Sequence, residues 1–261
     1  MKFLKSIFGA KSLGSIARKV GYVKDQMGIQ NRYVREQQQW QSHLENTKQY
    51  ILDFVENMLK RNSIAVLGSG WLLDVPIEKL AEQFETVYLY DIVHPEQIVV
   101  RMSHFPNARL QTCDLTGGAV LLAERAESFQ DFLDGLQTLK VEVDFSQYDA
   151  VVSVNLLNQL DILLCDFLSE KFSVKESDLK QVRKFVQQLH VNGLPAGKSC
   201  LITDVQEQNL SLQKGNTEYK DLIYCELPQS DSCREWVWKF DTNQMYHKGM
   251  HTFLKVHAMQ F

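Results

Sequence analysis

The sequence lacks the features that mark a membrane-spanning, secreted or nucleic-acid-binding protein. None of its apolar runs approaches the roughly 20 residues of a membrane-spanning helix. Its five cysteines are odd in number and form no CxxC pair, which is typical of reduced cysteines in a cytoplasmic protein. The net charge of −4 gives no general attraction to nucleic acid or to anionic lipid. We therefore predict a cytoplasmic protein with no membrane span and no nucleic-acid partner.

The N-terminal quarter has no proline and few strand-like patterns, and it is predicted to be helical. The opening MKFLKSIFGAKSL resembles a signal peptide only loosely, because Lys5 and Lys11 interrupt its apolar residues. Apolar residues at helical spacing over 1–27 suit either a membrane-surface helix or a helix that packs on the main domain or a second copy, and the glycines there favour packing. Residues 29–61 form a clearer amphipathic helix. Residues 1–62 are thus expected to be a helical arm that caps the sheet, covers a ligand cleft or supports a homo-oligomer.

The stretch from Ser63 to Asp91 has the pattern of a nucleotide-binding α/β unit. A short apolar strand ends in Gly68-Ser69-Gly70, an amphipathic helix follows, and a second strand ends in Asp91. Glycine lets the backbone turn sharply and lets a ligand approach it closely. Asp91 lies 21 positions after Gly70, where a carboxylate can accept both hydroxyls of a ribose. The G-x-G-x-x-G pattern is incomplete, because its third glycine is replaced by Leu73.

Strands and helices continue to alternate after this unit, with further strands predicted at 108–114, 148–155 and 199–204. Polar residues stand at four successive predicted strand ends: Asp91, Asp114, Asn155 and Asp204. Ligands of open parallel sheets bind at the carboxyl ends of the strands, although Asp and Asn are also common wherever a strand becomes a turn. Four such residues together favour a ligand site.

The last segment changes pattern. Residues 235–241 and 252–261 alternate apolar and polar side chains, and about ten residues join them, which predicts an antiparallel hairpin. The whole pattern predicts an α/β fold: a doubly wound, mostly parallel seven-stranded sheet that ends in an antiparallel hairpin. Residues 63–261 would form this domain, and the N-terminal helices would extend it.

From Ser63 to Phe261 the sequence resembles the class I S-adenosylmethionine-dependent methyltransferases, which have a Rossmann-like sheet completed by a terminal hairpin. The resemblance implies S-adenosylmethionine as cofactor, with the glycine turn under its methionine part, Asp91 on the ribose hydroxyls, and Asp114 and Leu115 at the adenine. The cofactor-binding residues that it implies are Gly68, Ser69, Gly70, Asp91, Ile92, Asp114, Leu115 and Asn155. The implied activity is methyl transfer to a small molecule or another acceptor that the sequence leaves unidentified.

Two positions depart from the family's acid-x-G-x-G-x-G loop: Val66 stands at the acid and Leu72 at the last glycine. A non-catalytic protein of this fold, acting as a binding or assembly module, is therefore the alternative. A nicotinamide-dependent oxidoreductase is a third hypothesis, which the terminal hairpin disfavours. The candidate bases for a methyl transfer are Asp204, His94 and His104, with Asn155 in a positioning role only.

A metal site is not predicted. His247 and His251 are four residues apart, but they fall in the expected hairpin connection and no CxxC or carboxylate motif accompanies them. The segments expected to select an acceptor, 156–198 and 205–231, contain no recognisable motif. The polar loop in the second segment suits a pocket wall and a solvated surface equally well.

Overall fold

The computed structural model describes residues 13–141, 143–230 and 232–261, so the first 12 residues of the helical pattern expected over 1–27 lie outside the described residues. Residues 13–20 are helical. Gly21, at φ 107°, separates them from helix α2, which spans Tyr22–Glu56 and runs through Gly28 without a break. The helix predicted over 29–61 therefore begins seven residues earlier, because one internal glycine costs only about 1 kcal/mol against the packing of so long an amphipathic face.

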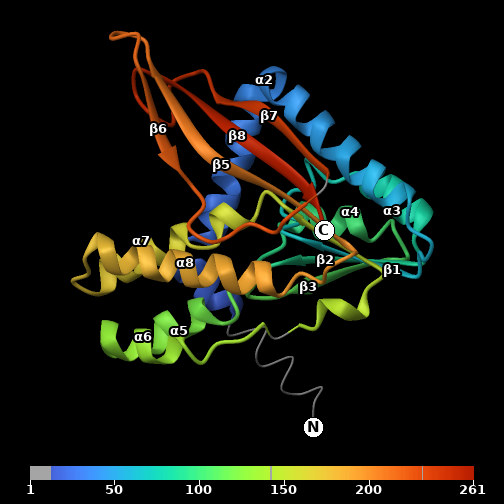
Figure 1. The fold of residues 1–261 in the computed structure, drawn as a ribbon, viewed down its shortest axis with the longest axis horizontal. Helices are drawn as coiled ribbons and strands as arrows, with labels where there is room; N and C mark the ends of the chain where they lie inside the picture. Colours follow the sequence, from blue (N-terminus) through green and yellow to red (C-terminus); the bar gives the residue numbers. More distant parts are fainter. Residues whose placement is uncertain (1–12, 142, 231) are drawn as a thin grey trace.

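One sheet forms the centre of the molecule, and its strands follow the order β3-β2-β1-β4-β5-β8-β7 (Figure 1). The first five of these strands are parallel, and β8 is antiparallel to both β5 and β7. The predicted doubly wound sheet with a terminal antiparallel hairpin is confirmed. The strand bounds are β1 Ser63–Leu67, β2 Thr86–Asp91, β3 Ala108–Thr112, β4 Ala150–Val154, β5 Ser199–Ser211, β6 Thr217–Asp221, β7 Ser232–Asp241 and β8 Met250–Gln260.

Helices cover both faces of the sheet because alternate strand residues point to opposite sides. On one face, Ile64 and Val66 of β1 pack in a core with α2, α3 and α4. On the other, Ala65 and Leu67 pack with α5 to α8. The helix bounds are α3 Ile77–Gln83, α4 Glu96–Met102, α5 Ala119–Arg125, α6 Phe129–Leu136, α7 Ile162–Lys171 and α8 Glu176–Asn192, with short 3₁₀ turns at Phe145–Gln147 and Leu157–Gln159.

Strand β5 differs most from the sequence-based prediction. It was expected to end at Asp204 but continues to Ser211, so Asp204 lies in the middle of a strand, next to an irregularity in the pairing with β8. The sheet also has an eighth strand, β6, which pairs with β5 only. β6 is formed by part of the polar loop whose role the sequence left open. Polar residues continue β5 because β8 and β6 supply hydrogen-bond partners along both of its edges.

Two helices, α5 and α6, follow β3, and residues 126–128 separate them. Within the residues that the structure describes, no helix is both long and apolar enough to cross a membrane. His251 belongs to β8 rather than to the hairpin connection in which it was expected.

Candidate functional site

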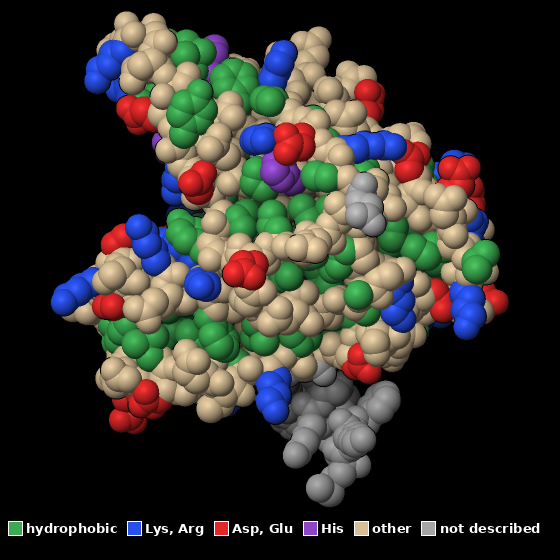
Figure 2. All heavy atoms as spheres, in the orientation of Figure 1, with side chains coloured by type: hydrophobic (Ala, Val, Ile, Leu, Met, Phe, Trp, Pro, Cys, Tyr) green, Lys and Arg blue, Asp and Glu red, His purple; other side chains and the backbone are tan. Residues whose placement is uncertain are grey.

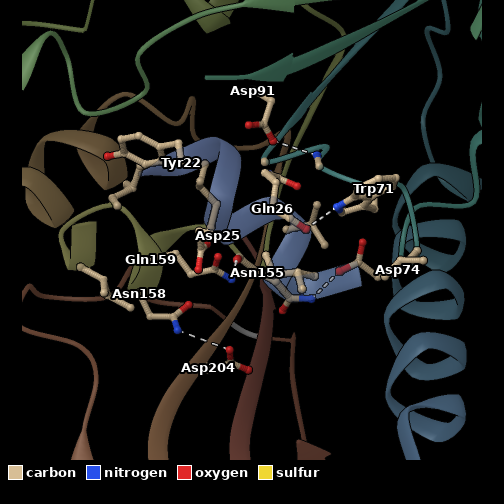
Figure 3. Close-up of a pocket in the computed structure, with 18 of the residues that line it drawn as sticks. Tyr22, Asp25, Gln26, Trp71, Asp74, Asp91, Asn155, Asn158, Gln159 and Asp204 are labelled. Atoms are coloured by element: carbon tan, nitrogen blue, oxygen red, sulfur yellow. Dashed lines mark hydrogen bonds between the residues drawn. The ribbon is translucent and has the colours of Figure 1, made fainter. Parts of the chain in front are cut away.

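A cavity of about 390 Å³ opens where the parallel strands end, between the sheet and helix α2 (Figure 3). Its walls come from the loops after β1 to β4, from the middle of β5 and from α2, α7 and β7. The fold brings together in this cavity all the residues that the family resemblance singled out: Gly68, Ser69, Gly70, Asp91, Ile92, Asp114, Leu115 and Asn155. Its volume lies within the range of about 300–1,000 Å³ that ligand pockets occupy.

The glycine turn is shaped by two requirements that only glycine meets at position 68. Gly68 has φ 82°, and a Cβ there would lie 2.8 Å from the Cβ of Leu156 and 2.9 Å from the carbonyl oxygen of Val154. The backbone N–H groups of Gly68 and Ser69 both donate to the carbonyl oxygen of Tyr90, at 3.0 and 3.1 Å. The turn after β1 is thereby held against the end of β2.

Val66 and Leu72, the two departures from the family loop, both lie in the core that faces α2 and do not line the cavity. Leu72 keeps the left-handed backbone of a glycine, with φ 54°, and its N–H closes a turn on the carbonyl oxygen of Ser69 at 2.8 Å. Burial of its side chain, which is 3% exposed, offsets the strain of that conformation. Leu72 therefore departs from the family loop without crowding the cavity, because its side chain packs in the core.

Asp91 joins the end of β2 to the glycine turn. Its Oδ2 accepts the N–H of Gly70 at 2.8 Å, and its Oδ1 accepts the N–H of Val93 at 3.3 Å. Burial raises the pKa of this carboxyl group, while the nearby His94 opposes the rise. Each carboxylate oxygen retains a lone pair for a hydroxyl group of a ligand in the cavity.

Asp114 lies two residues beyond the end of β3 and begins the loop to α5. Its Oδ1 accepts the N–H of Thr116 at 3.0 Å, and its Oδ2 accepts the N–H of Val120 at 3.2 Å. These bonds fix the carboxylate and the adjacent Leu115 at the rim of the cavity.

A chain of polar contacts crosses the cavity floor. The side-chain amide of Asn155 donates to Asp74 Oδ2 at 2.5 Å and lies 3.2 Å from His43 Nε2. On the far side of the His43 ring, Trp236 Nε1 donates to Nδ1 at 3.1 Å. Burial lowers the pKa of His43 to about 3, so the ring is neutral at physiological pH. Asn155, at φ 46°, keeps the left-handed conformation that asparagine tolerates better than most residues.

Asp204 is a buried carboxylate of the cavity with few hydrogen bonds. Its side chain is 1% exposed, its Oδ2 receives one long hydrogen bond of 3.4 Å from Asn158 Nδ2, and its Oδ1 has no hydrogen-bond partner (Figure 3). Burial raises the pKa of Asp204 to about 7, the Asn158 hydrogen bond lowers it, and the negative charge of Asp74 raises it further. A carboxyl group with such a pKa can take up and release a proton near neutral pH.

Helix α2 closes the side of the cavity that faces away from the sheet, and it supplies residues that the sequence analysis did not single out. Gln26 covers the glycine turn, because a Cβ on Gly70 would lie 3.6 Å from the Gln26 side-chain amide. Trp71 Nε1 donates to the backbone carbonyl oxygen of Gln26 at 2.7 Å. Tyr22 and Asp25 stand beside it in the cavity wall (Figure 3). Their contribution has no local sequence signal, because it depends on how α2 crosses the sheet.

The histidines named as candidate bases lie elsewhere. His94 does not line the cavity, and its Nε2 lies 3.2 Å from the carbonyl oxygen of Gln111. His104 is exposed after α4. Of the candidates, only Asp204 and Asn155 line the cavity. His247, which the sequence analysis considered for a metal site, has its Nε2 3.0 Å from Glu207 Oε1.

The described residues include one group with spacing suited to a metal ion, Cys233, Glu235 and His257, on the outer strands β7 and β8. The sequence analysis did not foresee it, because the two strands bring together residues more than 20 positions apart. Lys255 Nζ lies 2.9 Å from Glu235 Oε2, and this cation competes with a metal for the same carboxylate.

Five parallel strands in the order β3-β2-β1-β4-β5, followed by an antiparallel strand that a terminal hairpin inserts beside β5, define the class I methyltransferase fold. No protein-family model matches the sequence, and no curated protein matches it.

Several solved structures resemble the chain weakly. A Burkholderia thailandensis 1,6-didemethyltoxoflavin-N1-methyltransferase, solved with 1,6-didemethyltoxoflavin and S-adenosylhomocysteine bound, is 10% identical over 90% of this chain and 87% of that one, with a TM-score of 0.41. The DhpI-SAM-HEP complex is 12% identical over 91% and 97%, with a TM-score of 0.39. The 23S rRNA methyltransferase ErmE is 10% identical over 82% and 68%, with a TM-score of 0.30. Because all three scores are below 0.5, we rest the fold assignment on the strand order.

Proposed function

We propose that the chain is an S-adenosylmethionine-dependent methyltransferase that acts on a small molecule. One observation carries the proposal: the glycine turn after β1, Asp91 at the end of β2 and Asp114 beyond β3 line a single cavity of this fold. The turn would lie under the methionine part of the cofactor, Asp91 suits the ribose hydroxyls, and Asp114 with Leu115 suits the adenine. Bound there, the cofactor would supply an electrophilic methyl group on a positively charged sulfur.

The charge of the cavity supports a small-molecule acceptor over a nucleic acid. Carboxylates line it, and they attract a sulfonium ion but repel the phosphates of a nucleic-acid strand. On the molecular face drawn in Figure 2, basic and acidic side chains are interspersed, which does not suit the basic surface that phosphate binding needs.

Calorimetric titration of S-adenosylmethionine and S-adenosylhomocysteine into the full chain tests the proposal. We expect both to bind, and the variant Asp91→Asn to raise the Kd about ten- to a hundredfold, because it removes a charge-assisted hydrogen bond of about 1.5–3 kcal/mol. Asp221→Asn makes the same chemical change on the exposed strand β6 and should leave the Kd unchanged. If the folded protein binds neither compound, the proposal is wrong.

The alternative, a non-catalytic binding or assembly module, is favoured by one contact. The Gln26 amide lies over Gly70, where the methionine part of the cofactor would pass. In the alternative, this side chain closes the turn permanently. If S-adenosylmethionine does not bind the unmodified protein, the alternative is the better description, and binding to Gln26→Ala alone would identify Gln26 as the side chain that closes the turn. If S-adenosylmethionine binds the unmodified protein, Gln26 is a movable cover.

A further inference from the structure

The cavity has a second half that the proposed cofactor contacts do not use. Those contacts come mainly from the ends of β1, β2 and β3, on one side of the point where the strand order reverses. On the other side lie Asn158 after β4, Asp204 and Glu207 on β5, and Trp238 on β7. An acceptor reaching a cofactor bound over the glycine turn would occupy this half of the cavity.

The cavity is strongly acidic. Carboxylate side chains enter its wall from α2, from the end of β2, from β5, from α7 and from the loops after β1 and β3. They belong to Asp25, Asp74, Asp91, Asp114, Asp166, Asp204 and Glu207. Arg32 is the one lysine or arginine among the described lining residues. Its guanidinium lies over the rings of Phe240 and Tyr246, 4.5 and 5.0 Å from their centres. A ligand that brings positive charge would offset the repulsion among these acids.

Asp204 adds a specific sign of a missing partner. Its Oδ1 is buried and unbonded, and Asp204 is one of the residues that line the cavity, although a buried carboxylate oxygen without a donor is costly. The other carboxylate oxygen, Oδ2, receives one long hydrogen bond from the Asn158 amide. The neighbouring Asp74 is another acid and adds negative charge. The nearest protein groups therefore leave Oδ1 in need of a cationic or strongly donating group from a ligand.

The side chains around the acidic half are largely aromatic. Trp238 stacks on His43 with ring centres 3.9 Å apart, and Trp40 and Phe240 meet Trp238 edge to face at 4.7 and 5.0 Å. These rings line the cavity, and the faces of such rings attract organic cations. An alcohol or a thiol gains nothing from this field of negative charge, whereas an ammonium ion does.

Building on the proposed methyltransferase function, we infer that the acceptor is a small organic amine, which enters as an ammonium ion and is bound by Asp204. The ammonium gives one proton to the Asp204 carboxylate. The freed nitrogen lone pair then forms a bond to the methyl carbon, the carbon–sulfur bond breaks, and its electron pair stays on sulfur. The products are the N-methylated ammonium ion, which carries the positive charge formerly on sulfur, and S-adenosylhomocysteine, and the proton on Asp204 leaves to solvent. The pKa of Asp204, raised to about 7 by burial, suits this exchange.

Matched pairs of amines and alcohols test the inference without knowledge of the natural acceptor. The full chain, saturated with S-adenosylhomocysteine, is titrated calorimetrically with benzylamine and benzyl alcohol, cyclohexylamine and cyclohexanol, and isobutylamine and isobutanol. We expect at least one amine to bind about tenfold or more tightly than its alcohol, as a charge-assisted hydrogen bond predicts. Asp204→Asn should abolish this preference, and Asp221→Asn, on the exposed strand β6, should retain it.

Each outcome is decisive. If no amine binds more tightly than its alcohol, the inference is wrong; a preference that survives Asp204→Asn rejects Asp204 as the binding group. Binding of S-adenosylhomocysteine to Asp204→Asn verifies that the variant is folded. The cofactor titration separates the two claims: if the cofactor binds and no amine is preferred, only the amine is rejected, whereas failure of cofactor binding rejects the proposed function itself.

Discussion

Replacing Asp204 by asparagine should make the protein more stable at neutral and alkaline pH. The side chain is 1% exposed, and the groups that face it are the Asn158 amide after β4 and the Asp74 carboxyl group after β1. The Asn158 amide donates only a long hydrogen bond, and the negative charge of Asp74 repels a second one. The ionised form of Asp204 is therefore poorly stabilised in the folded protein. An asparagine has nearly the same shape, can still contact Asn158 and carries no charge.

The sign and the size follow from the pKa. Asp204 ionises at about 3.8 in the unfolded chain and at about 7 in the folded protein. Between these values the folded protein keeps a proton that the unfolded chain has lost, so the free energy of unfolding decreases as the pH rises. Above about pH 7 the loss is complete and amounts to at most about 4 kcal/mol, since each pKa unit corresponds to 1.36 kcal/mol. The asparagine of the variant does not ionise and has no such loss.

Urea unfolding of the wild-type protein and of Asp204→Asn, at about pH 4 and about pH 8, measures the effect. The advantage of the variant should grow between the two pH values by an amount approaching 4 kcal/mol. Asp221→Asn, at an exposed position on β6, should show almost no such growth. An Asp204→Asn advantage that does not change with pH would refute the reasoning, because it would mean that Asp204 ionises as easily in the folded protein as in the unfolded chain.

Three further substitutions test the surroundings of the cavity by urea unfolding. Leu72→Gly should destabilise by about 1–3 kcal/mol, because losing a buried leucine costs more than relief of its φ of 54° returns. Gly68→Ala should cost more than Gly197→Ala: their φ angles, 82° and 79°, are alike, but only the added Cβ at position 68 meets other atoms within 4 Å. Trp236→Phe should cost about 1–3 kcal/mol, because it leaves His43 Nδ1 without its donor; equal stability would mean that water replaces the indole.

The features that the sequence predicted well are those encoded locally. The apolar runs of β1 and β4, the turn at Gly68 and the alternation of the terminal hairpin each depend on the preference of a few adjacent residues. Asp91 could be named because its spacing from Gly70 is fixed by one strand, one helix and one more strand. The sheet order then places these residues in one cavity without further information.

The features that the sequence did not predict depend on pairings between distant segments. β5 continues past Asp204 because β6 and β8 complete its hydrogen bonds, which no pattern within residues 205–211 announces. Trp236 and His43 are 193 residues apart and meet only because α2 packs on β7. Asp74 stands four residues after Gly70 in the sequence, but its contact with Asn155 depends on β1 and β4 being neighbours.

The conformational and electrostatic costs of this structure gather around its cavity. Leu72 and Asn155 hold left-handed backbones in the loops after β1 and β4, and Asp204 keeps a buried carboxylate oxygen without a partner. Asparagine at position 204 would fold at least as well by the pH argument above, so stability of the fold does not account for the acid. An assembly module that works only through its N-terminal helices has no use for such a group inside the cavity. A protein that binds a cationic acceptor in the cavity has a use for Asp204, because the ligand supplies the positive charge and the hydrogen bond that the neighbouring residues do not.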